Sequence, residues 1–233
     1  MEEIQITSTS LQEYIQLLET NQKFSYTRWG DGEWGCVFGA EGYNVDHHEY
    51  FPEMAEGLRN ALKADKGYRK ATWPYTAPML RNIKPQVEEY LSSHNLSKKW
   101  YDARVWEDAA MSGEISSLIS QLEEMNLIFV TEPDKQKLPI HRVGFIEIPS
   151  VNCFLARDQI KQAMLEVVER FDNPVFAFSA SMATNVIIDQ IYDQIGNDCW
   201  MIDFGSIWEP YIGKRTRSYH ERYPEVTEVD NGQ

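Results

Sequence analysis

Hydrophobic positions recur along the chain with two periods, one typical of helices and one typical of strands. Apolar residues spaced three and four apart predict helices over residues 9–20, 51–64, 79–91, 115–125, 156–171 and 182–195. Short alternating or continuous apolar runs predict strands over residues 24–28, 101–106, 127–130, 143–148, 174–178 and 199–203. The two kinds of element alternate over most of the chain. This order predicts an α/β domain with a mainly parallel sheet flanked by helices.

Polar turns directly follow three of the predicted strands. The segment from residue 174 to residue 203 reads as strand, small-residue turn, helix and strand, which is a βαβ unit. In sheets of parallel strands, ligands bind beyond the carboxyl ends of the strands, where the strand order switches. Residues 30–33, 179–181 and 203–206 all occupy that position in the pattern. We therefore expect these three turns to be walls of one site.

The length and composition are those of one globular domain. The chain has 233 residues, 42% hydrophobic and 12% aromatic, without a repeat or linker, so residues 1–233 are predicted to form a single domain. No apolar run approaches the roughly 18 residues of a membrane span. The acidic N-terminus lacks the order of a signal peptide. Cys36, Cys153 and Cys199 are far apart, as is typical of reduced thiols. We expect a cytoplasmic protein.

The charge of the chain is strongly acidic. It has 36 acidic and 22 basic residues, which give a formal net charge of −14. Such a field repels nucleic acid at long range and disfavours DNA as the main partner, but it leaves room for local basic patches. One dense basic cluster, Lys214 to Arg217 with Arg222, stands among tyrosines. It is either a solvated turn or a phosphate-binding segment.

Asp31 and Glu33 are the strongest candidates for chemistry. They follow a predicted strand and are separated by one residue, so an extended or turning backbone would point both carboxylates to the same side. Such oxygens suit Mg²⁺ or Mn²⁺, which take further ligands from water and substrate phosphates. Gly30 and Gly32 let a bulky ligand approach the backbone, and Arg28 is placed to contact a phosphate. The alternative is a surface turn without a ligand.

A second candidate segment lies at the junction of the strand 174–178 and the helix after it. Small residues at a strand-to-helix junction leave backbone N–H groups and the helix dipole free to bind an anion. The hydroxyl groups of Ser179, Ser181 and Thr184 would add direct bonds to a diphosphate. The segment has neither a dinucleotide fingerprint nor a P-loop. Helix capping by Ser179 or Ser181 explains it almost as well.

Three further acidic positions are candidates, each with a structural alternative. Asp203 ends a predicted buried strand, where it either faces a ligand or forms an Asx-turn that shapes the loop. The run from Asp46 to Glu49 contains two histidines, but adjacent side chains in an extended segment point apart, so we expect a loop at the rim of the cleft rather than a metal site. Glu107 and Asp108 form an acidic pair, and either residue can be a general base. The alternative is that the pair belongs to a solvated turn.

These segments resemble a known family, the GT-D-type glycosyltransferases. Residues 24–33 resemble its f-s-x-x-R-F/Y-G-D-G-E signature, and residues 146–152 resemble its I-x-v-P-x-x-n strand and turn. Residues 176–188 resemble its a-l-G-p-x-a-x-x-l-a strand and helix, and residues 202–205 resemble its i-D-i-G segment. The similar blocks span about residues 24–211 in the family's order. Two positions depart from it: the Gly-Pro pair is Ala180-Ser181, and the histidine after i-D-i-G is Ser206.

The resemblance implies a Rossmann-like fold and a metal-dependent reaction with a nucleotide sugar, UDP-glucose in the founding examples. By that resemblance Asp31 and Glu33 are the metal-binding Asp-x-Glu motif, with Mn²⁺ or Mg²⁺ as the cofactor. Arg28, Gly30, Gly32 and the 179–184 turn would then line the donor site together with Asp203. The two departures lie in the expected donor pocket and leave the sugar open.

The expected function is therefore that of a hexosyltransferase. It would transfer a sugar, glucose by the resemblance, to an acceptor hydroxyl on a glycan or glycoprotein. An inverting reaction requires a general base, for which Asp108, Asp203 and Glu209 are candidates. One alternative is a phage-type DNA glycosyltransferase that acts on 5-hydroxymethylated pyrimidine bases. Others are a non-catalytic nucleotide-binding module and a metal-dependent phosphohydrolase.

Overall fold

Parallel strands form the centre of the computed structural model, which describes residues 3–224. The sheet has 8 strands in the order β1-β4-β3-β2-β8-β7-β5-β6, and every neighbouring pair is parallel. The strands are β1 (Gln5–Thr7), β2 (Ser25–Trp29), β3 (Arg69–Thr72), β4 (Lys99–Asp102), β5 (Asn126–Thr131), β6 (Gly144–Glu147), β7 (Pro174–Phe178) and β8 (Trp200–Asp203). The predicted α/β, Rossmann-like class with a parallel sheet is confirmed.

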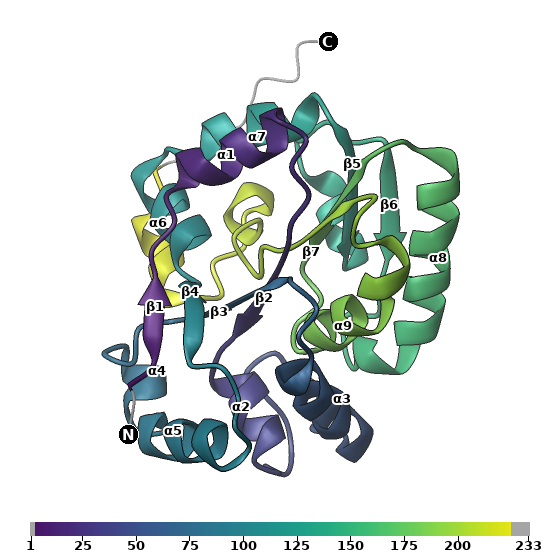
Figure 1. The fold of residues 1–233 in the computed structure, drawn as a ribbon. Coiled ribbons are helices and arrows are strands. Elements are labelled where there is room, and N and C mark those ends of the chain that lie inside the picture. Colours follow the sequence, from purple (N-terminus) through teal and green to yellow (C-terminus); the bar gives the residue numbers. More distant parts are fainter. Residues whose placement is uncertain (1–2, 225–233) are drawn as a thin grey trace.

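Helices cover both faces of the sheet (Figure 1). One face packs against α1 (Leu11–Glu19), α6 (Val105–Ser112) and α7 (Ile115–Glu123). The other face packs against α2 (Asp31–Val37), α3 (Pro52–Lys63), α4 (Pro78–Arg81), α5 (Lys84–Ser93), α8 (Arg157–Arg170) and α9 (Ala183–Ile195). Short 3₁₀ turns complete the chain: η1 (Pro133–Lys137), η2 (Cys153–Ala156), η3 (Glu209–Ile212) and η4 (Ser218–Arg222).

The direction in which the chain crosses the sheet decides which face each helix covers. The crossovers from β2 through β3 to β4, and from β6 through β7 to β8, run in one direction along the sheet, while those from β1 to β2 and from β4 to β5 run in the other. Crossovers between parallel strands are right-handed, so opposite directions put their helices on opposite faces. The two hydrophobic clusters divide the helices in this way.

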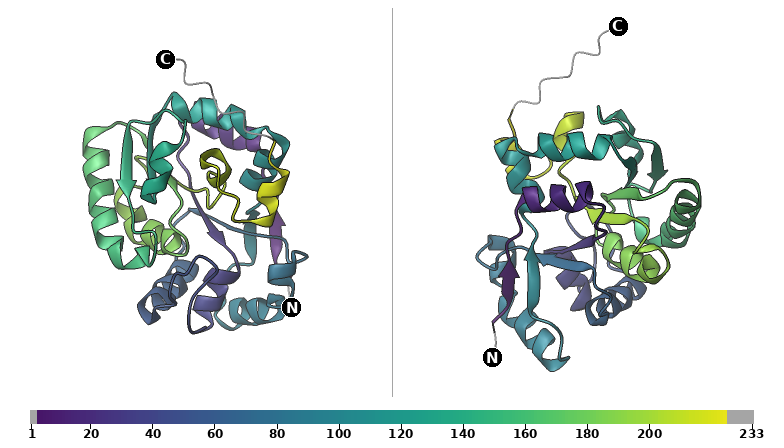
Figure 2. Two further views of the ribbon diagram at one scale, coloured as in Figure 1. Left: turned by 180° about the vertical axis from the view of Figure 1, so that it is seen from behind. Right: turned by 45° about the horizontal axis from the view of Figure 1, so that its top comes forward.

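This winding opens a crevice at the carboxyl ends of three neighbouring strands. The chain leaves β2 and β7 toward the face of α2 and α9, whereas it leaves β8, which lies between them, toward the face of α1, α6 and α7. Figure 2 shows η3 and η4, which follow β8, on the face of α6 and α7. A switch of this kind is where open α/β sheets bind ligands.

Most predicted elements are present, and three differ for local reasons. The predicted helix 79–91 is two helices, because Pro85 near the start of α5 lacks the N–H that a continuous helix needs. The predicted strand 101–106 ends at Asp102, whose carboxylate accepts a hydrogen bond from the backbone N–H of Arg104 at 3.0 Å. The predicted turn 30–33 is the start of α2, with Gly30 as its N-cap.

Candidate functional site

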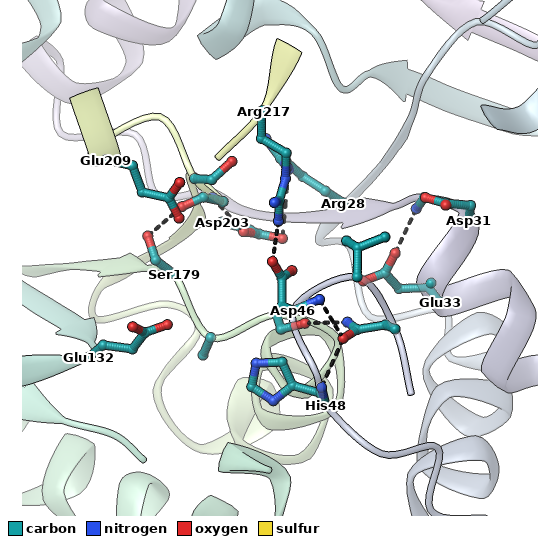
Figure 3. A pocket seen from close by; sticks show the side chains of 18 of the residues that line it. Arg28, Asp31, Glu33, Asp46, His48, Glu132, Ser179, Asp203, Glu209 and Arg217 are labelled. Atoms are coloured by element: carbon teal, nitrogen blue, oxygen red, sulfur yellow. Dashed lines mark hydrogen bonds and ion pairs between the residues drawn. The ribbon is translucent and has the colours of Figure 1, made fainter. Parts of the chain in front are cut away.

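A cavity of about 320 Å³ lies at the carboxyl ends of β2, β8 and β7 (Figure 3). The three polar turns that follow these strands, residues 30–33, 179–181 and 203–206, all contribute to its walls. The structure thus brings together the segments that the pattern of strands placed at one edge. The loop after α2, one side chain of α6, segments after β3, β5 and β6, and parts of the C-terminal region complete the lining.

Arg28, in β2, is a buried cation held between carboxylates. Its Nη1 lies 3.4 Å from Oε1 of Glu107, and its Nε lies 3.9 Å from Oδ2 of Asp203. The guanidinium also stacks on the ring of Trp73, 4.6 Å from the centroid. Burial lowers the pKa of Arg28, but the Asp203 and Glu107 carboxylates more than offset this and raise it above its ordinary value. The side chain is therefore charged, and its charge is shared with protein carboxylates.

Asp203 shapes the turn after β8 and also faces the cavity. Its Oδ1 accepts a hydrogen bond from the backbone N–H of Gly205 at 2.9 Å, which is the Asx-turn expected as one of two readings. Ser179 donates its hydroxyl hydrogen to the carbonyl of Gly205 at 2.5 Å and so joins the β7 and β8 turns. Burial raises the pKa of Asp203, and the positive charge of Arg28 opposes that rise.

Asp31 and Glu33 lie at one end of the cavity, in the first turn of α2. The expectation of an extended or turning backbone is wrong here, because the helix begins at Asp31. The two side chains nevertheless lie side by side (Figure 3), since Glu33 folds back and its Oε2 accepts a hydrogen bond from the Gly30 N–H at 2.7 Å. Burial, with the negative charges of Asp203 and Asp31, raises the pKa of Glu33 to about 7.

The chemistry of this carboxylate pair suits a hard divalent cation. Asp31 is exposed toward solvent and Glu33 is half-buried, so both have access to a ligand in the cavity. Among residues 3–224, no group of three or more His, Cys, Asp or Glu side chains is placed to hold a metal ion. The protein can therefore supply two carboxylates, with water and substrate phosphates completing the shell, as is common for Mg²⁺.

The residues of the 179–184 segment divide between the cavity and the core. Ser179 and Ser181 line the cavity, and the Ser181 hydroxyl accepts a hydrogen bond from Nδ2 of Asn44 at 3.1 Å. Thr184 does not line it. That side chain is fully buried in α9, and its hydroxyl has no hydrogen-bond partner within residues 3–224. The expected contact between Thr184 and a diphosphate is not supported by this placement.

The acidic pair in α6 also divides. Asp108 is exposed and lies outside the cavity, while Glu107 is buried and lines it. Successive helical residues point about 100° apart, so only one of the two side chains can face the sheet edge. Glu107 accepts a hydrogen bond from Nε1 of Trp73 at 3.1 Å in addition to its ion pair with Arg28.

A loop at residues 44–48 forms the opposite rim. The Asn44 side chain accepts hydrogen bonds from the backbone N–H groups of Asp46 and His48 at 3.0 and 2.9 Å. Nδ1 of His48 accepts from the backbone N–H of Asn152 at 3.0 Å, which leaves the ring proton on Nε2. Burial lowers the pKa of His48. The run 46–49 is thus a loop at the rim, as expected, with Nδ1 of His48 already engaged.

The basic C-terminal cluster is paired with acidic residues. Arg217 reaches across the cavity to an ion pair with Asp46 (Figure 3), and Lys214 pairs with Asp134. The hydroxyl groups of Ser206 and Tyr219 are 2.7 Å apart and hold the segment against the β8 turn. No sequence signal links Asp46 with Arg217, since they lie 171 positions apart and in separate loops.

Acidic side chains outnumber basic ones around the cavity. Among the described residues, 3 basic side chains line it, those of Arg28, Lys135 and Arg217. The 7 carboxylates that line it belong to Asp31, Glu33, Asp46, Glu107, Glu132, Asp203 and Glu209. The lining is therefore net acidic, which disfavours an anionic ligand that enters without a cation.

Comparison of the chain with protein-family models, with curated proteins and with solved structures finds no match. Within residues 3–224, no helix is both long enough and apolar enough to cross a membrane.

Proposed function

We propose that this protein is a metal-dependent glycosyltransferase that transfers a hexose from a nucleotide sugar to an acceptor hydroxyl. The observation that carries the proposal is the pair Asp31 and Glu33, which lies at one end of a cavity at the switch point of a parallel sheet. Resemblance of residues 24–33 to the GT-D-type glycosyltransferases supports the reaction class. The same resemblance makes UDP-glucose the first donor to test.

Asp31 and Glu33 would hold the divalent cation, Mn²⁺ or Mg²⁺. Such an ion, when bound, neutralises the charge of the departing nucleoside diphosphate. The excess of carboxylates around the cavity supports the need for such a cation, because these carboxylates would repel a diphosphate that enters alone.

The chain's own hydrogen-bond donors, beside this pair, can orient the donor substrate. The Ser181 hydroxyl accepts from Asn44, so its own hydrogen is free to donate into the cavity. His48 presents Nε2–H, because Nδ1 is engaged by Asn152. Fixed donors of this kind position a substrate for attack, and positioning supplies a large part of the acceleration in group transfer.

A glycan or glycoprotein acceptor is favoured over hydroxymethylated DNA. The net charge of −14 and the acidic lining of the cavity both repel a phosphate backbone. Lys214 and Arg217, from the basic cluster that would meet phosphates, are paired with Asp134 and Asp46. The cluster is therefore partly neutralised.

The test is release of nucleoside diphosphate from a panel of nucleotide sugars with Mn²⁺ or Mg²⁺. We expect metal-dependent release from one donor, abolished in Asp31→Ala and unchanged in Asp158→Ala, the same change at an exposed carboxylate of α8. A thermal shift with UDP and Mn²⁺ should follow the same pattern.

Failure to release diphosphate, with no thermal shift from any nucleotide sugar, contradicts the proposal. Hydrolysis of p-nitrophenyl phosphate with intact nucleotide sugars would instead favour the phosphohydrolase. Binding without turnover of any donor would favour the nucleotide-binding module. Plain and hydroxymethylated DNA, added with the active donor, test the DNA acceptor directly.

A further inference from the structure

Most of the carboxylates around the cavity already have a partner or a role. Asp31 and Glu33 form the pair proposed for the metal, and Asp46 is held by Arg217. Glu107 is held by Arg28 and by Trp73. Each of these groups is therefore unsuited to take a proton from an acceptor hydroxyl.

The three general bases expected from the sequence are also excluded or engaged. Asp108 lies outside the cavity on the exposed side of α6. Asp203 accepts a hydrogen bond from the Gly205 N–H, and its carboxylate lies 3.9 Å from Nε of Arg28. Glu209 accepts a hydrogen bond from the Thr216 hydroxyl, and its Oε2 lies 3.8 Å from Nδ1 of His220.

Glu132 is the remaining carboxylate, and its side chain has one long ion pair and no hydrogen bond among residues 3–224. It directly follows β5, beside the turn after β7, and its side chain is 29% exposed. Within residues 3–224 its carboxylate accepts no hydrogen bond, and its nearest cation, Nζ of Lys135, is 3.9 Å away. Figure 3 shows the carboxylate directed toward the open middle of the cavity, on the side away from Asp31 and Glu33.

The surroundings of Glu132 favour a base of useful strength. The charged groups that face it are Lys135 and Asp134 from η1, and Lys214 and Glu209 from the C-terminal segment. Burial raises the pKa of Glu132, and the positive charge of Lys135 opposes this only in part. A carboxylate with a raised pKa accepts a proton more readily than an exposed one.

We propose that Glu132 is the general base that deprotonates the acceptor hydroxyl, an assignment that rests on the proposed glycosyl transfer. The proton of the acceptor O–H moves to a carboxylate oxygen of Glu132 while the acceptor oxygen forms a bond to the anomeric carbon. The bond from that carbon to the diphosphate oxygen breaks, and the diphosphate leaves with the electron pair. Glu132 then returns the proton to water. One displacement of this kind inverts the anomeric configuration.

The variant Glu132→Gln tests this assignment, because glutamine keeps the size of the side chain and does not accept the proton. With UDP-glucose, saturating Mn²⁺ and methyl or octyl glucosides as acceptors, kcat should fall about 10²–10⁴-fold. The rise of kcat with pH that a general base predicts for the wild-type protein should be absent in the variant. The thermal shift with UDP and Mn²⁺ should stay, since donor binding does not use Glu132. Glu147→Gln, an exposed carboxylate of β6 outside the cavity, is the matched control.

Two further measurements separate a base from a structural side chain. Glu132→Asp should keep part of the activity and the pH dependence, because it retains a carboxylate. The sugar in the product should have the inverted configuration by NMR. Activity of Glu132→Gln within threefold of the wild type, or retention of configuration, overturns the assignment. Donor binding without any wild-type turnover, to water included, also overturns it. Absence of nucleotide binding in the wild type identifies failure of the proposed function itself.

Discussion

The guanidinium of Arg28 lies directly against the backbone of Gly205, with no room for a side chain between them. A Cβ atom on Gly205 would lie 2.3 Å from Nη2 of Arg28, and the residue has a φ of +59°. Two features therefore favour glycine at this position: the positive φ of the backbone, and the close approach of the Arg28 guanidinium, which is buried between Glu107 and Asp203.

Gly205→Ala should destabilise the fold by about 3 kcal/mol or more, since it adds a steric clash to left-handed backbone strain. Gly213→Ala is the matched control: Gly213 has a φ of +77°, and nothing lies within 4 Å of its added Cβ. That variant should lose only about 1 kcal/mol. Urea unfolding of both variants measures the difference. Equal losses of unfolding free energy in the two variants would show that Arg28 moves away from the added Cβ without destabilising the fold.

Arg28→Met should destabilise the protein by about 3–5 kcal/mol, because it leaves Glu107 and Asp203 buried without their cation. Arg104→Met removes a pair with Asp102 in which the Arg104 side chain is 45% exposed to solvent, and it should cost about 0–1 kcal/mol. Chemical denaturation at neutral pH compares the two. A small loss of unfolding free energy in Arg28→Met would mean that Glu107 and Asp203 become protonated and are no longer buried charges.

Glu33 makes the stability of the protein depend on pH in a predictable direction. Its pKa is raised from an ordinary 4.5 to about 7, so between these values the folded state binds more protons than the unfolded state. The free energy of unfolding should therefore fall as the pH rises from about 4.5 to 7, and the full cost of the ionised group applies above 7.

Glu33→Gln should lack this fall while keeping an oxygen for the Gly30 N–H. The difference in unfolding free energy between wild type and variant should change by about 1–3 kcal/mol across that window. Denaturant titrations in EDTA at pH 5 and pH 8 measure it, and parallel pH curves for the two proteins would refute the assignment.

Thr184→Val should leave nucleotide binding unchanged and stabilise the fold by about 1 kcal/mol, because it removes a buried hydroxyl without a partner in the described chain. Ser181→Ala, three positions earlier and at the cavity wall, should weaken binding of UDP with Mn²⁺ severalfold. Calorimetric titration of both variants gives the comparison. Weaker binding of UDP with Mn²⁺ in Thr184→Val would show that Thr184 does contribute to the donor site.

The strands β5, β7 and β8 were predicted from nearly continuous apolar runs, because their side chains are buried on both faces of the sheet. In β5 the run Leu127 to Val130 is fully buried, and such a strand must be apolar throughout. The strand β3 was missed because its first two residues are charged. Arg69 lies over the rings of Tyr14 and Tyr101, and Lys70 donates hydrogen bonds to carbonyl groups at the end of α3. Long cationic side chains can cover apolar surface in this way, so hydrophobic periodicity does not detect them.

The candidate site was predictable where it depends on strand ends and unpredictable where loops meet. The turns that contain Asp31, Ser179 and Asp203 follow parallel neighbouring strands, so their convergence follows from the sheet. The pairing of Asp46 with Arg217 depends on the paths of two loops, which carry no periodic signal.

The ion pair between Asp46 and Arg217 joins a segment that is synthesised early to one that is synthesised late. Chains emerge from the ribosome with the N-terminal part first. The Asp31 side of the cavity is synthesised early, but Arg217 and Tyr219, which line the same cavity, are among the last described residues to appear. A nascent chain can thus build the whole sheet before Arg217 and Tyr219 complete the wall of the cavity, so the cavity takes its final form after the core.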